Sequence, residues 1–154
     1  MALPAIIIDT REKDPFPLAL LGAAVIRRKL DTGDYSIDGL ESRVCLERKS
    51  LDDFVGTFVM HMRARRAGNQ SRWGREIERM KLIPRRVIVI EGTLEHIEAG
   101  LYRAKVHKHQ LFGYITRLEE HHGIDVRFIG VRPSSTKWAH GWLTEAANEL
   151  TSKT

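Results

Sequence analysis

The run Val87-Ile88-Val89-Ile90 is the feature that most constrains how this chain folds. Four consecutive β-branched residues predict a strand, and their unbroken apolar character predicts that the strand is buried on both faces. Such a strand lies in the interior of a sheet that has helices packed on each face. The run therefore predicts the central strand of an α/β protein.

The rest of the chain predicts the elements around this strand. Further strands are expected at residues 5–8, 23–27, 35–37 and 43–48, joined by turns as an antiparallel meander, and at 124–129. Helices are expected after Ser50, over 71–82, after Thr93, over 106–118 and around Trp138, Trp142, Ala146 and Leu150. Together they predict a single α/β domain, residues 1–154, with a mixed β-sheet flanked by helices.

Composition narrows the class of protein. The 154 residues are 42% hydrophobic and 29% charged, which suits one domain with its own core. No stretch is long enough to span a bilayer, and the first residues lack the pattern of a secretory signal. The single cysteine, Cys45, allows no intrachain disulfide and argues against a cysteine-based zinc site. We therefore expect an intracellular protein with no membrane partner.

Positive charge is concentrated in one segment. The net charge is +5, but residues 61–86 carry nine Lys and Arg residues and two Glu residues, so this segment is +7 and the remainder is −2. Arginine forks onto phosphate oxygens and gives salt-dependent binding, so the segment predicts a DNA-binding surface. A solvated helix face is the alternative. The candidates for DNA contact are Arg11, Arg63, Arg65, Arg66, Arg72 and Arg75.

A short pattern around Glu47 predicts chemistry. Glu47 and Lys49 are two apart on a predicted strand, so both project to one face, and hairpin pairing brings Asp34 alongside. Phosphodiester hydrolysis needs carboxylates that hold a cation, and a positive group that steadies the attacking water. Magnesium suits such a site because it takes oxygen ligands. Alone the pattern is weak, because exposed strand ends often carry such charges.

Neighbouring motifs make the pattern specific. The chain contains Asp9-Thr10-Arg11-Glu12, then Gly33-Asp34, then Glu47-Arg48-Lys49 followed by Asp53. This series resembles the XPF-type nuclease family of the PD-(D/E)XK superfamily, whose signature is a GD pair followed by ERKxxxD. The resemblance is strong over residues 6–58 and looser as far as Glu91-Gly92.

The resemblance implies a restriction-endonuclease-like fold and an endonuclease that uses Mg²⁺ or Mn²⁺. Its substrate would be branched, flap or fork DNA in repair or recombination. Asp34 and Glu47 would be the direct metal ligands. Asp9 and Glu12 would complete or support the metal site.

The other motif residues would act around the metal. The resemblance implies that Lys49 orients the attacking water and that Arg48 braces the site from the opposite face or touches DNA. Asp53 would hold the cluster from the start of its helix. Structural alternatives are a capping-box acid for Asp53, a turn cap for Asp9 and a surface ion pair for Arg11-Glu12. Gly33 is expected to provide a positive-φ turn.

Other functions remain open from the sequence. A nicking or junction-resolving nuclease would use the same residues, whereas a non-catalytic DNA-binding subunit typically lacks the acids that are present here. None of the seven histidines forms a metal-binding pattern. The tandem helix-hairpin-helix domain of the family is not found in these 154 residues, which leaves open a homodimer or a partner subunit. A bacterial, archaeal or phage origin is expected.

Overall fold

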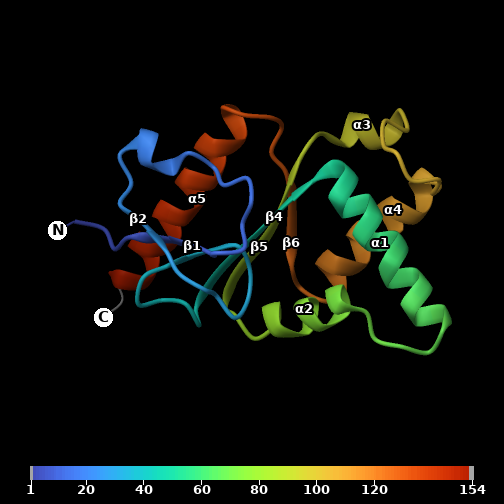
Figure 1. Cartoon of the computed structure of the whole chain (residues 1–154), viewed down its shortest axis with the longest axis horizontal. Coiled ribbons are helices and arrows are strands. Elements are labelled where there is room, and N and C mark those ends of the chain that lie inside the picture. Colours follow the sequence, from blue (N-terminus) through green and yellow to red (C-terminus); the bar gives the residue numbers. More distant parts are fainter. Residues whose placement is uncertain (1, 153–154) are drawn as a thin grey trace.

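The computed structural model describes residues 2–152. It contains a six-stranded sheet with helices packed on both faces. The strand order is β2-β1-β3-β4-β5-β6. Figure 1 shows α5 on one side of the strands and α1 and α4 on the other. The elements in chain order are β1 (Ile6–Ile8), η1 (Leu18–Leu21), β2 (Val25–Arg27), β3 (Tyr35–Ile37), β4 (Val44–Ser50), α1 (Leu51–Arg66), α2 (Arg72–Met80), β5 (Arg85–Glu91), α3 (Leu94–Glu98), α4 (Lys108–Glu120), β6 (Asp125–Phe128) and α5 (Ser134–Thr151).

Strand β5 lies in the interior of the sheet, as its apolar run predicts. It pairs in parallel with β4 on one side and with β6 on the other. Residues 87–90 are all fully buried. Ile88 and Ile90 face the core under α1, α2 and α4, while Val87 and Val89 face the core under α5. The predicted mixed sheet flanked by helices is therefore confirmed.

The predicted antiparallel meander before β5 is right for β3 and β4 but wrong for β2, because β1 and not β2 lies beside β3. β1 pairs antiparallel with β3, and β3 pairs antiparallel with β4. β2 pairs with β1 in parallel, with Ile6 opposite Val25, and forms an edge of the sheet. The reason is the long connection through η1, because it returns the chain to the end of the sheet where β1 began.

Capping side chains start two of the predicted helices. Ser50 Oγ accepts a hydrogen bond from the amide of Asp53 at 3.1 Å, and α1 follows directly. Thr93 Oγ1 accepts from the amide of His96 at 3.2 Å at the start of α3. Each bond satisfies an amide that has no partner within its helix. Both N-caps were predicted and are confirmed.

Apolar faces of the other helices pack as their periodicity predicts. In α2, Trp73, Ile77 and Met80 are buried, although the helix ends at Met80 rather than at residue 82. In α4, Leu111, Ile115 and Leu118 are buried. In α5, Ala146 and Leu150 are buried, while Trp138 and Trp142 are half-buried against the same core. Within residues 2–152, no helix is long and apolar enough to cross a membrane.

Candidate active site

Asp34 and Glu47 lie side by side where β3 meets β4. Gly33 has a φ of 80° and packs against Cys45, and this turn leads Asp34 into pairing with β4. The Asp34 amide donates to the Leu46 carbonyl at 3.0 Å, and the Asp34 carboxylate accepts from the Arg48 amide at 2.8 Å. These bonds bracket Glu47, so the side chain of Asp34 lies next to it. Hairpin pairing thus brings the two acids together, as expected from the sequence.

Burial dominates the electrostatics of this pair. Burial raises the pKa of Glu47 well above its ordinary value of 4.5, and the adjacent Asp34 carboxylate raises this pKa further. Burial also raises the pKa of Asp34. The two carboxyl groups are within hydrogen-bonding reach of each other, so the pair favours sharing a proton. Glu47 is buried and Asp34 is half-buried, so both carboxylates favour a nearby positive charge.

Lys49 is the cation that faces the pair. Its Nζ lies 3.9 Å from Glu47 Oε2 and 4.6 Å from the centre of the Trp73 ring. The ring face attracts the ammonium group, and the Trp73 indole N–H donates to the Tyr114 hydroxyl at 2.6 Å. Trp73 therefore belongs to the core, as expected, and also holds Lys49 in the position that strand alternation predicts.

Arg48 points to the other face of β4 and joins two acids there. It donates from Nε and Nη2 to the two oxygens of Glu12, each at 2.8 Å, and from Nη1 to Glu91 at 3.0 Å. Burial raises the pKa of Glu12, but Arg48 outweighs it and holds this pKa below its ordinary value. The structure thus places Glu12 against Arg48, and from there its charge raises the pKa of Asp34. The alternative of an Arg11-Glu12 surface ion pair is wrong.

Asp9 fastens the loop that follows β1. Its Oδ1 accepts from the Leu30 amide at 2.8 Å, and its Oδ2 accepts from Arg11 Nε at 2.9 Å and from the Arg11 amide at 3.3 Å. The Asp9 amide donates to the Asp34 carbonyl at 2.8 Å, so the two segments are paired. The turn-cap alternative for Asp9 fits these bonds. Asp9 also borders the cavity beside Asp34 and Glu47.

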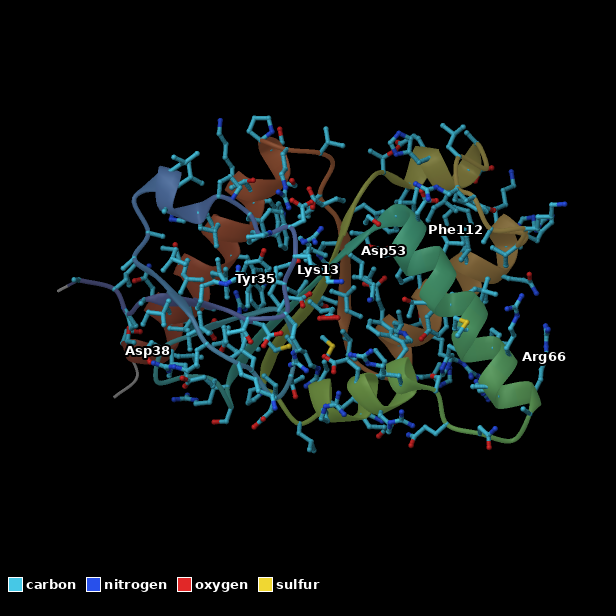
Figure 2. The ribbon with its side chains drawn as sticks, viewed as in Figure 1. Lys13, Tyr35, Asp38, Asp53, Arg66 and Phe112 are labelled. Atoms are coloured by element: carbon cyan, nitrogen blue, oxygen red, sulfur yellow. The ribbon has the colours of Figure 1, made fainter. Side chains whose placement is uncertain are left out.

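A cavity of about 950 Å³ opens over the carboxylate pair. Asp34, Glu47 and Lys49 line it, together with residues from α1 and α2. Asp53 lines it from the first turn of α1, with its side chain exposed, and Figure 2 shows Asp53 at one end of this helix and Arg66 at the other. The amide of Asp53 makes the N-cap bond, so half of the capping-box alternative is observed. Asp53 therefore combines a capping position with a place at the cavity.

Of the six predicted DNA-contacting arginines, two line the cavity and four do not. Arg11 and Arg72 line the cavity over the carboxylate pair. Arg63, Arg65 and Arg66 lie in the last turn of α1, where all three are exposed. The remaining candidate, Arg75, is exposed on α2 and donates to the carbonyl of Gln70. The segment is therefore an exposed basic surface, of which only one part reaches the cavity.

Glu76 is a site residue that the sequence prediction missed. Its Oε1 accepts from the Gly33 amide at 3.0 Å, so α2 holds the turn that presents Asp34. Glu76 pairs with Arg79, lines the cavity and raises the pKa of Glu47 as one of several nearby charges. Helical phase offered a signal, because residue 76 lies beside the buried Trp73 and Met80 on the same helix.

The donors at the pair fit a hard divalent cation. Asp34 and Glu47 offer only carboxylate oxygens, and a bound cation would offset the burial that raises both pKa values. Within residues 2–152, no group of three or more His, Cys, Asp or Glu side chains is arranged to hold a metal ion. Two carboxylates are sufficient for Mg²⁺, since it keeps several waters and takes further oxygens from a phosphate.

Comparison of the sequence with known families identifies the family of this chain. The sequence profile of the ERCC4 domain matches residues 8–141. The chain belongs to the ERCC4 domain family. The predicted relationship to XPF-type nucleases is therefore confirmed. A search of curated proteins gave no match.

Solved structures share the fold of this ERCC4 domain. XPF from Aeropyrum pernix aligns with a TM-score of 0.71 and 18% identity, over 97% of this chain and 68% of that one. XPF from Aeropyrum pernix in complex with DNA aligns with a TM-score of 0.64 and 22% identity, over 97% of this chain and 66% of that one. The predicted α/β fold is thus confirmed as that of an XPF nuclease domain.

Proposed function

We propose that this ERCC4 domain is a Mg²⁺- or Mn²⁺-dependent endodeoxyribonuclease. Its substrate would be branched, flap or fork DNA in repair or recombination. The observation that carries the proposal is the pair of half-buried Asp34 and buried Glu47 beside Lys49, in a cavity of about 950 Å³. Membership of a nuclease family supports the reaction, and the XPF structure in complex with DNA supports the substrate class.

Asp34 and Glu47 hold the cation in this proposal. When bound, the cation supplies Lewis-acid chemistry, since it withdraws charge from the scissile phosphate and makes water more acidic. Asp9 supports the site from the adjacent segment through its pairing with Asp34. Glu12 supports it indirectly, because its bonds to Arg48 fix the far face of β4.

Lys49 acts on the water and on the developing negative charge. It is held between Glu47 and the Trp73 ring, which fixes a positive group on the cavity side of β4. Asp53, at the cavity edge in the first turn of α1, holds the cluster from the start of this helix in the proposal. Arg11 and Arg72 line the same cavity and contact backbone phosphates of the bound DNA in this proposal.

A cleavage assay on labelled flap, fork, four-way junction and plain duplex DNA, with and without Mg²⁺, tests the proposal. We expect cutting of at least one branched substrate only with metal, and loss of cutting in Asp34→Asn. Asp38→Asn is the matched control, because Asp38 lies beyond the other end of β3, where it pairs with Arg28. Metal-independent cutting, or equal loss in both variants, contradicts the assignment. Binding without cutting by the parent indicates a non-catalytic subunit.

A further inference from the structure

A second cavity, of about 460 Å³, lies between the end of α1, α2 and the end of α4. Its chemically distinctive lining residues are His61, Arg65, Glu78, Arg117 and His122. His61 also lines the catalytic cavity, so the two cavities adjoin at this residue. None of the sequence motifs includes Arg117 or His122.

The lining of the second cavity has excess positive charge. Arg65 and Arg117 are exposed, and neither forms an ion pair with an acid of residues 2–152. The one acid in the lining, Glu78, lies 3.4 Å from Lys81. The two arginines, Arg65 on α1 and Arg117 on α4, therefore outnumber the one acid, Glu78 on α2.

The two histidines respond to this charge. Burial lowers the pKa of His61, and Arg65, His122 and Arg117 lower it further. Burial also lowers the pKa of His122, as do Lys81 and Arg117, while Glu78 opposes them. His122 Nδ1 is buried and has no hydrogen-bond partner within the described part of the chain. A bound anion would relieve the repulsion among these groups.

His61, which lines both cavities, contacts Ser71 of the catalytic cavity. His61 Nδ1 lies 2.6 Å from Ser71 Oγ, which joins α1 to the N-cap of α2. Gly74 leaves room for this contact, because a Cβ there would lie 3.2 Å from Ser71 Oγ and 3.4 Å from His61 Cε1. Because the two cavities adjoin at His61, one DNA strand can reach both.

We propose that the second cavity binds a backbone phosphate of the DNA strand whose scissile bond lies in the catalytic cavity. The identity of the ligand rests on the proposed nuclease function, whereas the preference for a phosphate group rests on the cavity alone. Arg65 and Arg117 donate to the phosphate oxygens as forked cations. His61 and His122 add donors when they are protonated.

Nuclear magnetic resonance titration of the full chain tests the anion site without any need for cleavage. We expect inorganic phosphate, and separately a single-stranded oligonucleotide, to raise the pKa of His61 and His122. His140, on α5, is the internal control and should not respond. If neither probe moves His61 or His122, the site is wrong. If inorganic phosphate moves them and the oligonucleotide does not, the cavity takes free phosphate and the assignment to the DNA strand is overturned.

A second experiment measures the DNA affinity of an Arg117→Ala variant. It is made in a Glu47→Gln background so that no DNA is cut. We expect about tenfold weaker binding and a shallower salt dependence, because one charge-assisted phosphate contact is lost. Arg43→Ala is the matched control, since it removes the same charge just before β4, at a residue that lines neither cavity. Equal affinity in Arg117→Ala and the parent overturns the proposal even if the parent cleaves DNA. Weaker binding by Arg117→Ala supports it even if the parent fails to cleave.

Discussion

At the residue scale, Glu47 and Asp34 are the groups whose charge opposes folding. Burial raises the pKa of Glu47, so the folded protein favours its neutral form. The stability that this carboxyl contributes is therefore largest at low pH and is lost as pH rises through the ordinary value of 4.5 toward the raised one. A bound cation reverses this relation, because it stabilises the ionised pair.

Glu47→Gln should therefore raise the melting temperature of the metal-free protein at neutral pH, because a neutral side chain replaces a buried carboxylate of nearly the same shape. It should also remove the increase in melting temperature that Mg²⁺ or Mn²⁺ gives the parent. Thermal unfolding with chelator and with added metal measures both effects. Glu95→Gln on the exposed face of α3 is the control and should keep the metal response. An undiminished metal response in Glu47→Gln would mean that the cation binds elsewhere.

Glu12 should show the opposite pH behaviour, since Arg48 holds its pKa below the ordinary value of 4.5. Its stabilising effect is present at neutral pH and is lost as pH falls below 4.5 through the lowered value. Glu12→Gln should cost about 3 kcal/mol at neutral pH, because it breaks a buried ion pair, and the cost should shrink in acid.

Urea unfolding at neutral and acidic pH measures this cost. Glu41→Gln is the comparison, because its pair with Arg28 is exposed and its loss should change the free energy of unfolding by about 0.5 kcal/mol or less. Equal costs for the two variants would mean that the Glu12–Arg48 pair does not brace β4.

Strand geometry explains which site residues were predictable from sequence. Period-two alternation put Glu47 and Lys49 on one face and Arg48 on the other, and hairpin pairing put Asp34 beside Glu47. Glu76 and Glu91 reach the site from α2 and from the end of β5. Their contacts depend on how distant elements pack, and the local pattern around each residue does not encode that packing.

At the element scale, most helices and strands follow from periodicity, whereas the direction of β2 does not. The apolar run of β5 and the apolar spacing of α2 and α4 predicted these elements. Each of them has to bury its apolar residues, and the period of the buried positions indicates a strand or a helix. The direction in which β2 pairs with β1 depends on the end of the sheet to which the connection through η1 returns. Short strands with turn residues on both sides are compatible with either direction.

The turn at Gly33 is the element on which the site geometry most depends. A Cβ at this residue would overlap Cys45 Sγ, and its φ of 80° disfavours other residues. The sequence predicted the positive φ but not the close approach. Gly33→Ala should destabilise the protein by about 1–3 kcal/mol from overpacking, in addition to backbone strain.

Gly39→Ala separates the backbone strain from the overpacking. Its φ of 84° gives the same strain, but nothing lies within 4 Å of a Cβ there, so no overpacking is added. Chemical unfolding should show a larger loss of stability in Gly33→Ala than in Gly39→Ala. Adding Cys45→Ala to the Gly33→Ala variant should recover part of that difference, because it removes the overlapping Sγ. If the two glycine variants lose equal stability, the packing against Cys45 does not fix the turn.

At the scale of the whole molecule, positive charge gathers on the surface formed by α1 and α2. Arg63 and Arg66 are exposed at the end of α1, away from the catalytic cavity. Replacing both with alanine should weaken DNA binding at low salt and reduce the magnitude of the salt slope by roughly 1 to 2, as expected for one or two lost phosphate contacts.

Fluorescence anisotropy over a salt series measures this slope, and the metal requirement for cleavage should stay as in the parent. Arg28→Ala is the control, because Arg28 pairs with Asp38 and Glu41 near the other edge of the sheet. An unchanged slope in the Arg63 and Arg66 double variant would remove the end of α1 from the DNA-binding surface.

The central claim is that the Asp34–Glu47 pair holds the cation that this ERCC4 domain uses to cut DNA. Single-turnover cleavage of one branched substrate by the parent and by Glu47→Gln, across a Mg²⁺ titration, tests it most directly. We predict that the parent cuts only with Mg²⁺ and that Glu47→Gln is slower by at least about a thousandfold at every metal concentration, since metal-assisted charge stabilisation is worth several kcal/mol. A Glu47→Gln variant that cuts as fast as the parent would contradict the claim.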